Sequence, residues 1–136
     1  MPNTAKLELQ QALYQALSSD GNLTSLLGSG KIYDHVPQRT KPPYVTIGMT
    51  LEREWNTSTE DGREHVITFH SWTENKGRKQ ALEILVAIEQ AILSAPLVMT
   101  SQTLVNKVFE FNEVRRDPDG ETIHGITRFQ MKTEPL

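Results

Sequence analysis

The sequence predicts an α+β fold in which an antiparallel sheet of about four strands packs against one long helix and an N-terminal helix. Two segments repeat apolar residues at three- and four-residue steps, the period of a helix with one buried face. Other segments alternate apolar and polar residues or are apolar and β-branched, as strands are. No repeat, low-complexity stretch or linker divides the 136 residues, so residues 1–136 are expected to form a single domain.

The first helix is expected over residues 4–18, with Thr4 as its N-cap. Its buried face should consist of Ala5, Leu9, Ala12, Leu13, Ala16 and Leu17. One more short helical turn should end at Gly28, and residues 32–33 suit a brief strand. The prolines of residues 36–43 predict an extended loop, because each fixes its own φ and keeps its predecessor out of the helical region.

Residues 44–51 alternate as a strand with a single buried face does. That face should carry Val45, Ile47, Met49 and Leu51. Residues 52–63 are polar apart from Trp55, which predicts either a long loop or the tip of a protruding hairpin. Residues 64–72 form the next expected strand.

The strongest helix pattern covers residues 76–93, and Ala95-Pro96 ends it. Its apolar stripe should be Ala81, Leu82, Leu85, Ile88, Ile92 and Leu93. Residues 103–116 and 121–133 flank Asp117-Pro118-Asp119-Gly120, whose proline and glycine suit a tight turn, so they should form a hairpin. Both parities of residues 103–116 carry apolar side chains, which indicates either a strand covered on both sides or a bulge.

Composition excludes several classes of function. The chain has no cysteine, which removes disulfides and thiolate chemistry and suits folding in a reducing cytoplasm. The net charge of -3 has the wrong sign for gripping a phosphate backbone. The apolar stretches are far shorter than the roughly 20 residues of a membrane span. We therefore expect no membrane association and at most passive contact with DNA.

Titratable residues do not converge on a catalytic site. The four histidines are His35, His65, His70 and His124. His65 and His70 are five residues apart in a strand and so should point to opposite faces, whereas His70 and His124 could face each other across paired strands. No carboxylate cluster with metal-ligand spacing accompanies them. The sequence therefore predicts no catalytic residue, no metal, no cofactor and no enzyme activity.

The close carboxylates and the two tryptophans also have plain structural interpretations. The carboxylate pairs suit exposed strand ends and turns, where such side chains bond to nearby backbone. Trp72 ends an apolar strand and is expected in the core. Trp55 lies in a polar segment and suits either an interface anchor or a lid that folds back on the domain.

The order and spacing of several short motifs resemble a known family. The motifs are Leu26-Leu27-Gly28, Ile32-Tyr33-Asp34-His35-Val36-Pro37, Pro43-Tyr44-Val45-Thr46-Ile47-Gly48, His65-Val66-Ile67-Thr68-Phe69-His70-Ser71-Trp72, Ala95-Pro96-Leu97, Val114-Arg115-Arg116-Asp117-Pro118-Asp119-Gly120 and His124-Gly125. Together they resemble the tail completion, or tail terminator, proteins of siphophages and gene transfer agents. The resemblance covers almost the whole chain.

This resemblance implies a structural protein of the phage tail and neck, assembled in the cytoplasm of a bacterial host. Its subunits would form a hexameric ring that caps the tail tube protein and presents a surface to the head connector or stopper protein. The alternatives are another neck protein, such as a stopper or adaptor, and a small-ligand binding module with a pocket between the long helix and the sheet near His70 and His124. The candidate assembly contacts are Glu52, Arg53, Trp55, Asp61 and Arg63 in the polar segment and Asp117 and Asp119 in the turn.

Overall fold

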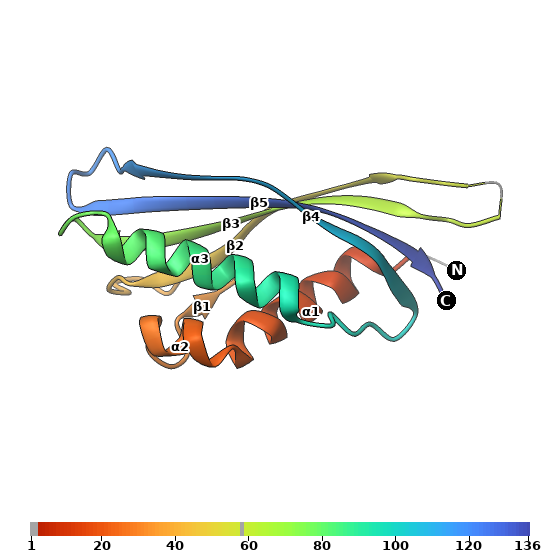
Figure 1. Ribbon diagram of the computed structural model, residues 1–136, viewed down its shortest axis with the longest axis horizontal. Helices are drawn as coiled ribbons and strands as arrows, with labels where there is room; N and C mark the ends of the chain where they lie inside the picture. The colour runs from red at the N-terminus through yellow and green to blue at the C-terminus, as the bar shows by residue number, and fades with distance from the viewer. Residues whose placement is uncertain (1–2, 58) are drawn as a thin grey trace.

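A computed structural model describes residues 3–57 and 59–136; Met1, Pro2 and Ser58 of the expected 1–136 domain lie outside the described residues. The elements follow in the order α1 (Ala5–Ser19), α2 (Gly21–Leu27), β1 (Ile32–Tyr33), β2 (Tyr44–Glu54), β3 (Arg63–Glu74), α3 (Lys79–Ser94), β4 (Gln102–Arg116) and β5 (Thr122–Pro135). The described strands form one five-stranded sheet in the order β1-β2-β3-β5-β4 (Figure 1). The predicted α+β class is confirmed, with β1 added as a short strand parallel to β2.

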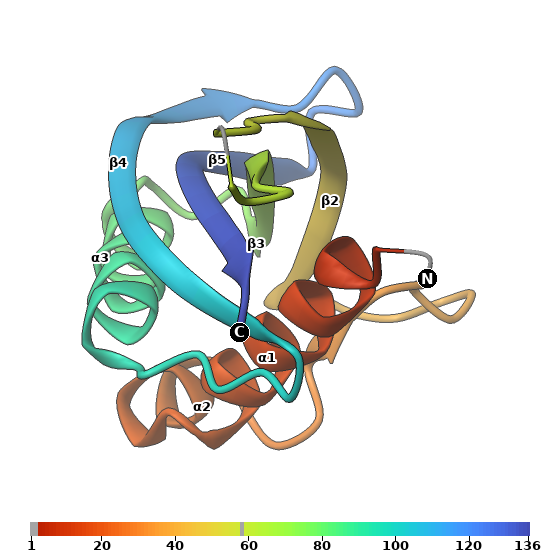
Figure 2. The same cartoon turned by 90° about the vertical axis from the view of Figure 1, so that its right-hand side faces the viewer.

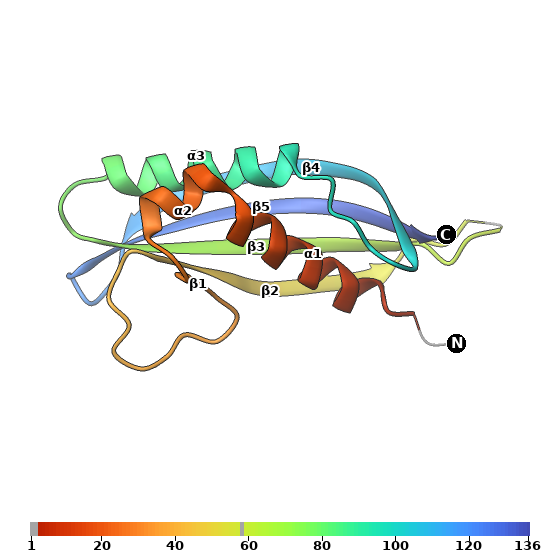
Figure 3. The same ribbon diagram turned by 90° about the horizontal axis from the view of Figure 1, so that it is seen from below.

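Among residues 3–57 and 59–136, the helices all lie on one face of the sheet and none covers the other face (Figures 1 and 3). We call this uncovered side the helix-free face. At one end the β2–β3 hairpin extends past the helices, and the turn between β4 and β5 lies at the opposite end (Figure 1). Seen along the strands, the sheet is strongly twisted, with α3 at its left and α1 and α2 below it (Figure 2).

Helix α1 buries the stripe that its periodicity predicts, with Ala16 only partly buried. The cap differs from the expectation, because the Thr4 side chain caps no backbone N–H of the helix. Instead Asn3 Oδ1 accepts a hydrogen bond from the Ala5 backbone N–H at 2.8 Å. Thr4 Oγ1 donates to Glu8 Oε2, so the threonine hydroxyl serves a side chain rather than the helix backbone.

Strand β2 buries Val45 and Ile47 but not the other two residues of its predicted apolar face. Its register against β3 shifts between Ile47 and Thr50, which is a β-bulge. The inserted residue reverses which parity faces the helices. Met49 and Leu51 are therefore 75% and 49% exposed, and the prediction that they are buried is wrong.

Helix α3 buries Ala81, Leu85, Ile88 and Ile92 of its predicted stripe, but the prediction is wrong for the other two residues. Leu82 and Leu93 are exposed, whereas Ile84, Ala87 and Ala91 are buried. The small side chains at positions 87 and 91 let the helix lie close to its neighbours, which turns Leu82 and Leu93 toward solvent.

The C-terminal end of α3 is held by a lysine from β4. Lys107 Nζ donates to the backbone oxygens of Ile92, Leu93 and Ala95 at 2.9, 3.0 and 2.7 Å. These carbonyls carry the negative end of the helix dipole and lack partners within the helix, so a cation stabilises them. Burial lowers the pKa of Lys107 below its usual value.

Strand β4 contains two register shifts against β5, one between Leu104 and Asn106 and one between Phe109 and Phe111. Bulges therefore explain why apolar residues occupy both parities of this strand. The predicted turn is confirmed: Gly120 N donates to Asp117 O at 3.0 Å, and Gly120 has a φ of 73°.

The core lies between the helices and the covered face of the sheet. Phe69 and Phe129 are fully buried at its centre with edge-to-face rings, centroids 6.2 Å apart. Trp72 is not part of this core. It lies half-buried on the opposite parity of β3, on the helix-free face, so the prediction for it is wrong.

Candidate functional site

The predicted assembly contacts occupy two separate regions at opposite ends of the sheet (Figure 1). The β2–β3 hairpin carries Glu52, Arg53, Trp55, Asp61 and Arg63. The turn between β4 and β5 carries Asp117 and Asp119. The structure therefore brings together the members of each group but not the two groups. A surface made by one copy alone cannot combine them.

Ion pairs cross the two strands of the hairpin. Arg53 Nε lies 2.9 Å from Glu64 Oε1, and Arg63 Nη1 lies 3.7 Å from Glu52 Oε1. Arg63 Nη2 also lies 3.4 Å from Asp61 Oδ1. Such pairs between partly exposed side chains contribute little to stability, about 0–1 kcal/mol each. They follow the backbone register of the projecting hairpin and leave charged groups at its surface.

Trp55 folds back onto its own hairpin rather than projecting from it. Its backbone N–H donates to Gly62 O at 2.9 Å. A Cβ at Gly62 would lie only 2.8 Å from Trp55 Cε3, so glycine allows the indole to lie against the opposite strand. Lys132 Nζ of β5 lies over the indole, 5.0 Å from the ring centroid and within cation–π range. The half-buried indole thus ties the hairpin to β5 and leaves part of its surface exposed.

The two aspartates of the β4–β5 turn serve the turn itself. Asp119 Oδ1 accepts hydrogen bonds from the backbone N–H groups of Glu121 and Thr122 at 2.8 and 3.1 Å. These hydrogen bonds lower the pKa of Asp119, and the bond from the Glu121 backbone has the largest effect. Asp117 accepts the closing bond of the turn through its backbone oxygen. Both residues are explained by local geometry without a partner.

His65 and His70 point to opposite sides of the sheet, as their spacing predicts. His65 is fully buried under the helices, and its Nε2 lies 2.9 Å from Thr133 Oγ1. Burial lowers the pKa of His65 to about 4, and the charges of Arg63 and Lys6 act in the same direction. A neutral imidazole with one hydroxyl partner, closed off from solvent, is a structural group rather than a catalytic base.

His70 and His124 meet across β3 and β5 on the helix-free face, with His70 Nδ1 2.7 Å from His124 Nε2. The His124 ring stacks on Trp72 with centroids 3.9 Å apart, and Tyr44 lies beside Trp72 at 6.4 Å. Burial lowers the pKa of both histidines, that of His124 to about 4 with a further contribution from His70. The imidazoles face away from the long helix, so the predicted ligand pocket between that helix and the sheet near them is wrong.

Acidification should destabilise the fold between about pH 6.5 and pH 4. In that window the histidines of the unfolded chain take up protons, while burial keeps His65 and His124 neutral in the folded state. A group whose folded pKa is lowered in this way contributes its full stability above its unfolded pKa and loses it as pH falls. Urea unfolding at a series of pH values should show the free energy of unfolding declining throughout this range.

His65→Gln is the matched variant, because glutamine keeps a polar group near Thr133 and does not titrate. Its loss of stability on acidification should be shallower than that of the wild type. Equal slopes for both proteins would contradict the assignment of this effect to His65. Glu8 contributes in a separate, more acidic pH window. Hydrogen bonds lower its pKa to about 2, and the bond from the Ser101 side chain has the largest effect.

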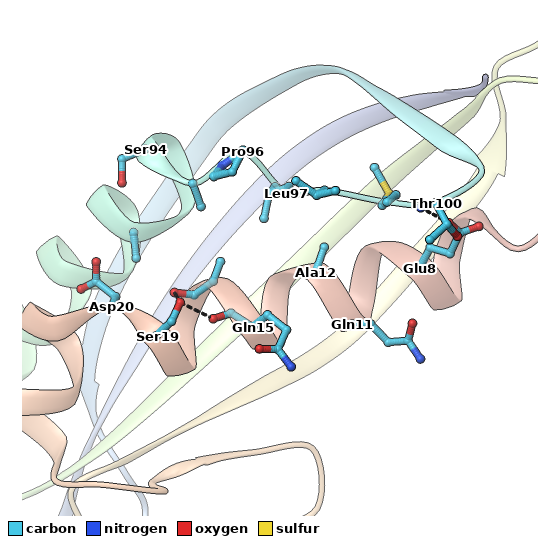
Figure 4. A pocket seen from close by; sticks show the side chains of 15 residues that line it. Glu8, Gln11, Ala12, Gln15, Ser19, Asp20, Ser94, Pro96, Leu97 and Thr100 are labelled. Carbon is cyan, nitrogen blue, oxygen red and sulfur yellow. Dashed lines mark hydrogen bonds between the residues drawn. The ribbon is translucent and has the colours of Figure 1, made fainter.

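A groove of about 800 Å³ lies between α1 and the segment that joins α3 to β4 (Figure 4). Glu8 closes one end of it, accepting bonds from Thr100 N at 2.8 Å and Ser101 N at 2.9 Å, and also from the Ser101 hydroxyl. The Glu8 carboxylate therefore holds the connecting segment against α1, and its oxygens are already engaged in hydrogen bonds. The rest of the lining combines small and amide side chains of α1 and α3 with the apolar Leu97, Val98 and Met99 of the connecting segment.

The described residues contain no group of three or more histidine, cysteine, aspartate or glutamate side chains that could hold a metal ion. Within residues 3–57 and 59–136, no helix is both long and apolar enough to cross a membrane. What sequence reasoning missed is the pair of sheet edges and the helix-free face, where exposed Met49 and Leu51 lie on β2 and exposed Val105 and Val108 lie on β4. The two sheet edges and the helix-free face can form non-covalent contacts with a partner, through backbone hydrogen bonds along the strands and through rows of side chains.

Comparisons with known proteins agree over nearly the whole chain. A family model described as "Tail completion protein gp17" matches residues 11–134. The tail completion protein gp17 of Bacillus phage SPP1 is 29% identical over 128 residues, covering 93% of this chain and 92% of the relative.

Two solved structures share the fold. A chain in the virion of a native gene transfer agent particle has a TM-score of 0.82 and 27% identity, covering 93% of this chain and 94% of that one. The structure of the gp17 protein of bacteriophage SPP1 has a TM-score of 0.62 and 25% identity, covering 95% and 91%. Both similarities extend over the helices and the sheet alike.

Proposed function

Because the chain belongs to the tail completion protein gp17 family, we propose that it is a structural tail terminator of a phage-like particle. Copies of it form a ring, hexameric in this proposal, that caps the last ring of the tail tube and joins it to the head connector. The ring covers the tube edge to which another tube subunit would otherwise add. Assembly is then the activity, and no catalytic group, metal or cofactor takes part.

One observation carries this proposal: the fold of the chain matches that of a chain in an assembled gene transfer agent virion over 93% of its length. Two features of this chain support it. The β2–β3 hairpin extends past the helices and can reach a neighbour (Figure 1). The sheet also has open edges, which suit contacts between identical subunits arranged head to tail. DNA would pass such a ring with at most passive contact.

Electron microscopy of particles that lack this protein tests the proposal. Termination predicts abnormally long tails or tails without heads, because nothing stops the tube or joins it to the connector. A stopper or adaptor predicts filled heads that leak DNA beside free tails of normal length. The second result would reject termination in favour of another neck role, and normal, attached tails would reject both.

The hairpin is proposed to contact a neighbouring subunit or the tube through Glu52, Arg53, Trp55, Asp61 and Arg63, with Asp117 and Asp119 as a second contact. Trp55→Ala should reduce the fraction of particles with attached tails of normal length. The substitution removes the exposed part of the indole and frees the hairpin from Lys132, so the contact loses both area and rigidity. Complementation of a deletion strain, with tail lengths measured by microscopy, gives the result.

Trp55→Phe is the control, since a phenyl ring can still lie against Gly62 and face Lys132. It should retain most tail attachment. Thermal unfolding of both variants separates loss of contact from loss of fold, because Trp55 lies outside the buried core. Normal attachment with Trp55→Ala would remove this residue from the proposed interface.

A further inference from the structure

Both edges of the sheet offer backbone groups to a partner strand. At one edge β4 spans fifteen residues and, in the part of the chain that the structure describes, pairs with β5 alone. At the other edge β1 pairs with β2 only at Val45 and Thr46. The outer side of β2 from residue 47 to residue 54 therefore has no strand beside it among the described residues. Open edges of this length pair readily with another chain unless they are covered.

The strand directions make these two edges compatible with each other. β2 is antiparallel to β3, β3 to β5, and β5 to β4, so β4 runs opposite to β2. A rotation about an axis along the strands leaves strand directions unchanged. It would therefore place β4 of one copy antiparallel to β2 of the next, and the same operation repeated closes a ring. Each copy would use one edge of each kind.

Side chains at the two edges match at equal height on the helix-free face. The register links Leu51 to Val66, Val66 to Gln130 and Gln130 to Val108, so Leu51 and Val108 end one row across the sheet. They are 49% and 43% exposed. Rotation about an axis along the strands keeps each row level, which sets the Leu51 of one copy beside the Val108 of its neighbour. Both apolar side chains would then leave water together.

Neighbouring rows continue this pattern. The next row meets the exposed Met49 region of the β2 bulge at one edge and Phe111 at the other. On the other side of the Leu51 row, the row through Glu64 and Lys132 has Arg53 at one edge and Asn106 at the other. Apolar residues thus oppose apolar residues in the middle, and no row among these opposes two like charges.

We propose that copies of this chain join by pairing β4 of one subunit with the 47–54 segment of β2 in the next, antiparallel and in the unshifted register that sets Leu51 against Val108. This inference rests on the ring proposed above and names the surface that closes it. The helix-free faces of all subunits then form one continuous wall. The partner is a second copy of this chain, recognised by backbone hydrogen bonds and by the matched apolar rows.

Introduced cysteines test the pairing directly, because the natural chain contains none. The double variant Leu51→Cys with Val108→Cys is expressed in a deletion strain, and purified particles are treated with a short bis-maleimide. Cross-strand Cβ atoms lie about 4.5–5.5 Å apart, within reach of such a reagent. Immunoblotting against this chain should show a ladder of covalent multimers that ends at the size of the ring. A monomer band alone would overturn the proposal.

Single and displaced cysteines are the controls. Leu51→Cys or Val108→Cys alone should stay monomeric, since a head-to-tail contact brings together one residue of each kind. Covalent dimers of either single variant would show like edges paired about a two-fold axis and would contradict the ring. The pair Leu82→Cys with Val108→Cys uses an exposed leucine of α3 and should give no ladder.

Charge exchange provides a second measurement that does not depend on a reagent. Leu51→Glu and Val108→Lys should each lower incorporation into particles by about tenfold, because each contact would bury one unpaired charge. The double variant should recover incorporation, since every contact then holds an opposite pair. Wild-type incorporation of both single variants would overturn the inference and leave termination intact. Normal tails in the deletion strain would instead reject the proposed function itself.

Discussion

Phe129→Ala should lower the free energy of unfolding by about 3–5 kcal/mol, a large part of the stability of an ordinary domain. Phe129 is fully buried at the centre of β5. Its ring meets Phe69 of β3 and Phe109 of β4 edge to face, with centroids 6.2 and 5.7 Å apart. Truncation removes the transfer free energy of the ring and leaves a cavity that three strands and α3 cannot close.

Phe111→Ala is the matched control for this prediction. Phe111 is a half-buried phenylalanine of β4, on the helix-free face, where it lies 5.0 Å from the Arg128 guanidinium carbon. Its loss should cost only about 1 kcal/mol, because its ring already faces solvent and the cation–π contact is weak. Urea unfolding of both variants, fitted to a two-state transition, gives the comparison. Similar losses for the two variants would mean that the aromatic core is not centred on Phe129.

Periodicity predicted the helices and main strands because each buries one face, and burial leaves a repeat in the sequence. The bulge between Ile47 and Thr50 left no such trace. It adds a residue without changing composition, so the alternation through Met49 and Leu51 read as one continuous buried face. The predicted buried stripe of α3 is wrong at two positions for a related reason. The alanines at 87 and 91 pack against neighbours, while the leucines at 82 and 93 do not.

The candidate surfaces were predictable only where local chemistry defines them. Turn residues marked the Asp117–Gly120 turn, and a polar run marked the projecting hairpin. The open edges depend on strand order, which places β5 between β3 and β4 and so exposes β4. That order is a long-range property without a local signal. The position of Trp72 also depends on a long-range contact. Its ring stacks on His124 of β5 instead of packing in the core.

Gly125→Val should lower the free energy of unfolding by about 3 kcal/mol through overpacking. Gly125 is buried in β5 beneath α3, and its backbone needs no positive φ. Space is the limiting factor. A Cβ at this position would collide with Ser71 Oγ and would lie 3.1 Å from Leu85 Cδ2 of α3. Valine adds two methyl groups to that contact, so either the helix moves outward or side chains leave their preferred rotamers.

Second-site changes show whether the contact with Ser71 causes the loss. Gly125→Ala should cost about 1–3 kcal/mol, and adding Ser71→Ala should restore part of it. Ser71 Oγ is buried and makes no hydrogen bond within residues 3–57 and 59–136, so its removal forfeits none. Gly21→Ala, at an exposed glycine with no atom within 4 Å of the new Cβ, should be neutral or slightly stabilising. Additive effects of the Gly125 and Ser71 changes would place the strain against Leu85 instead, and a neutral Gly125→Ala would contradict the close approach of α3 to the sheet.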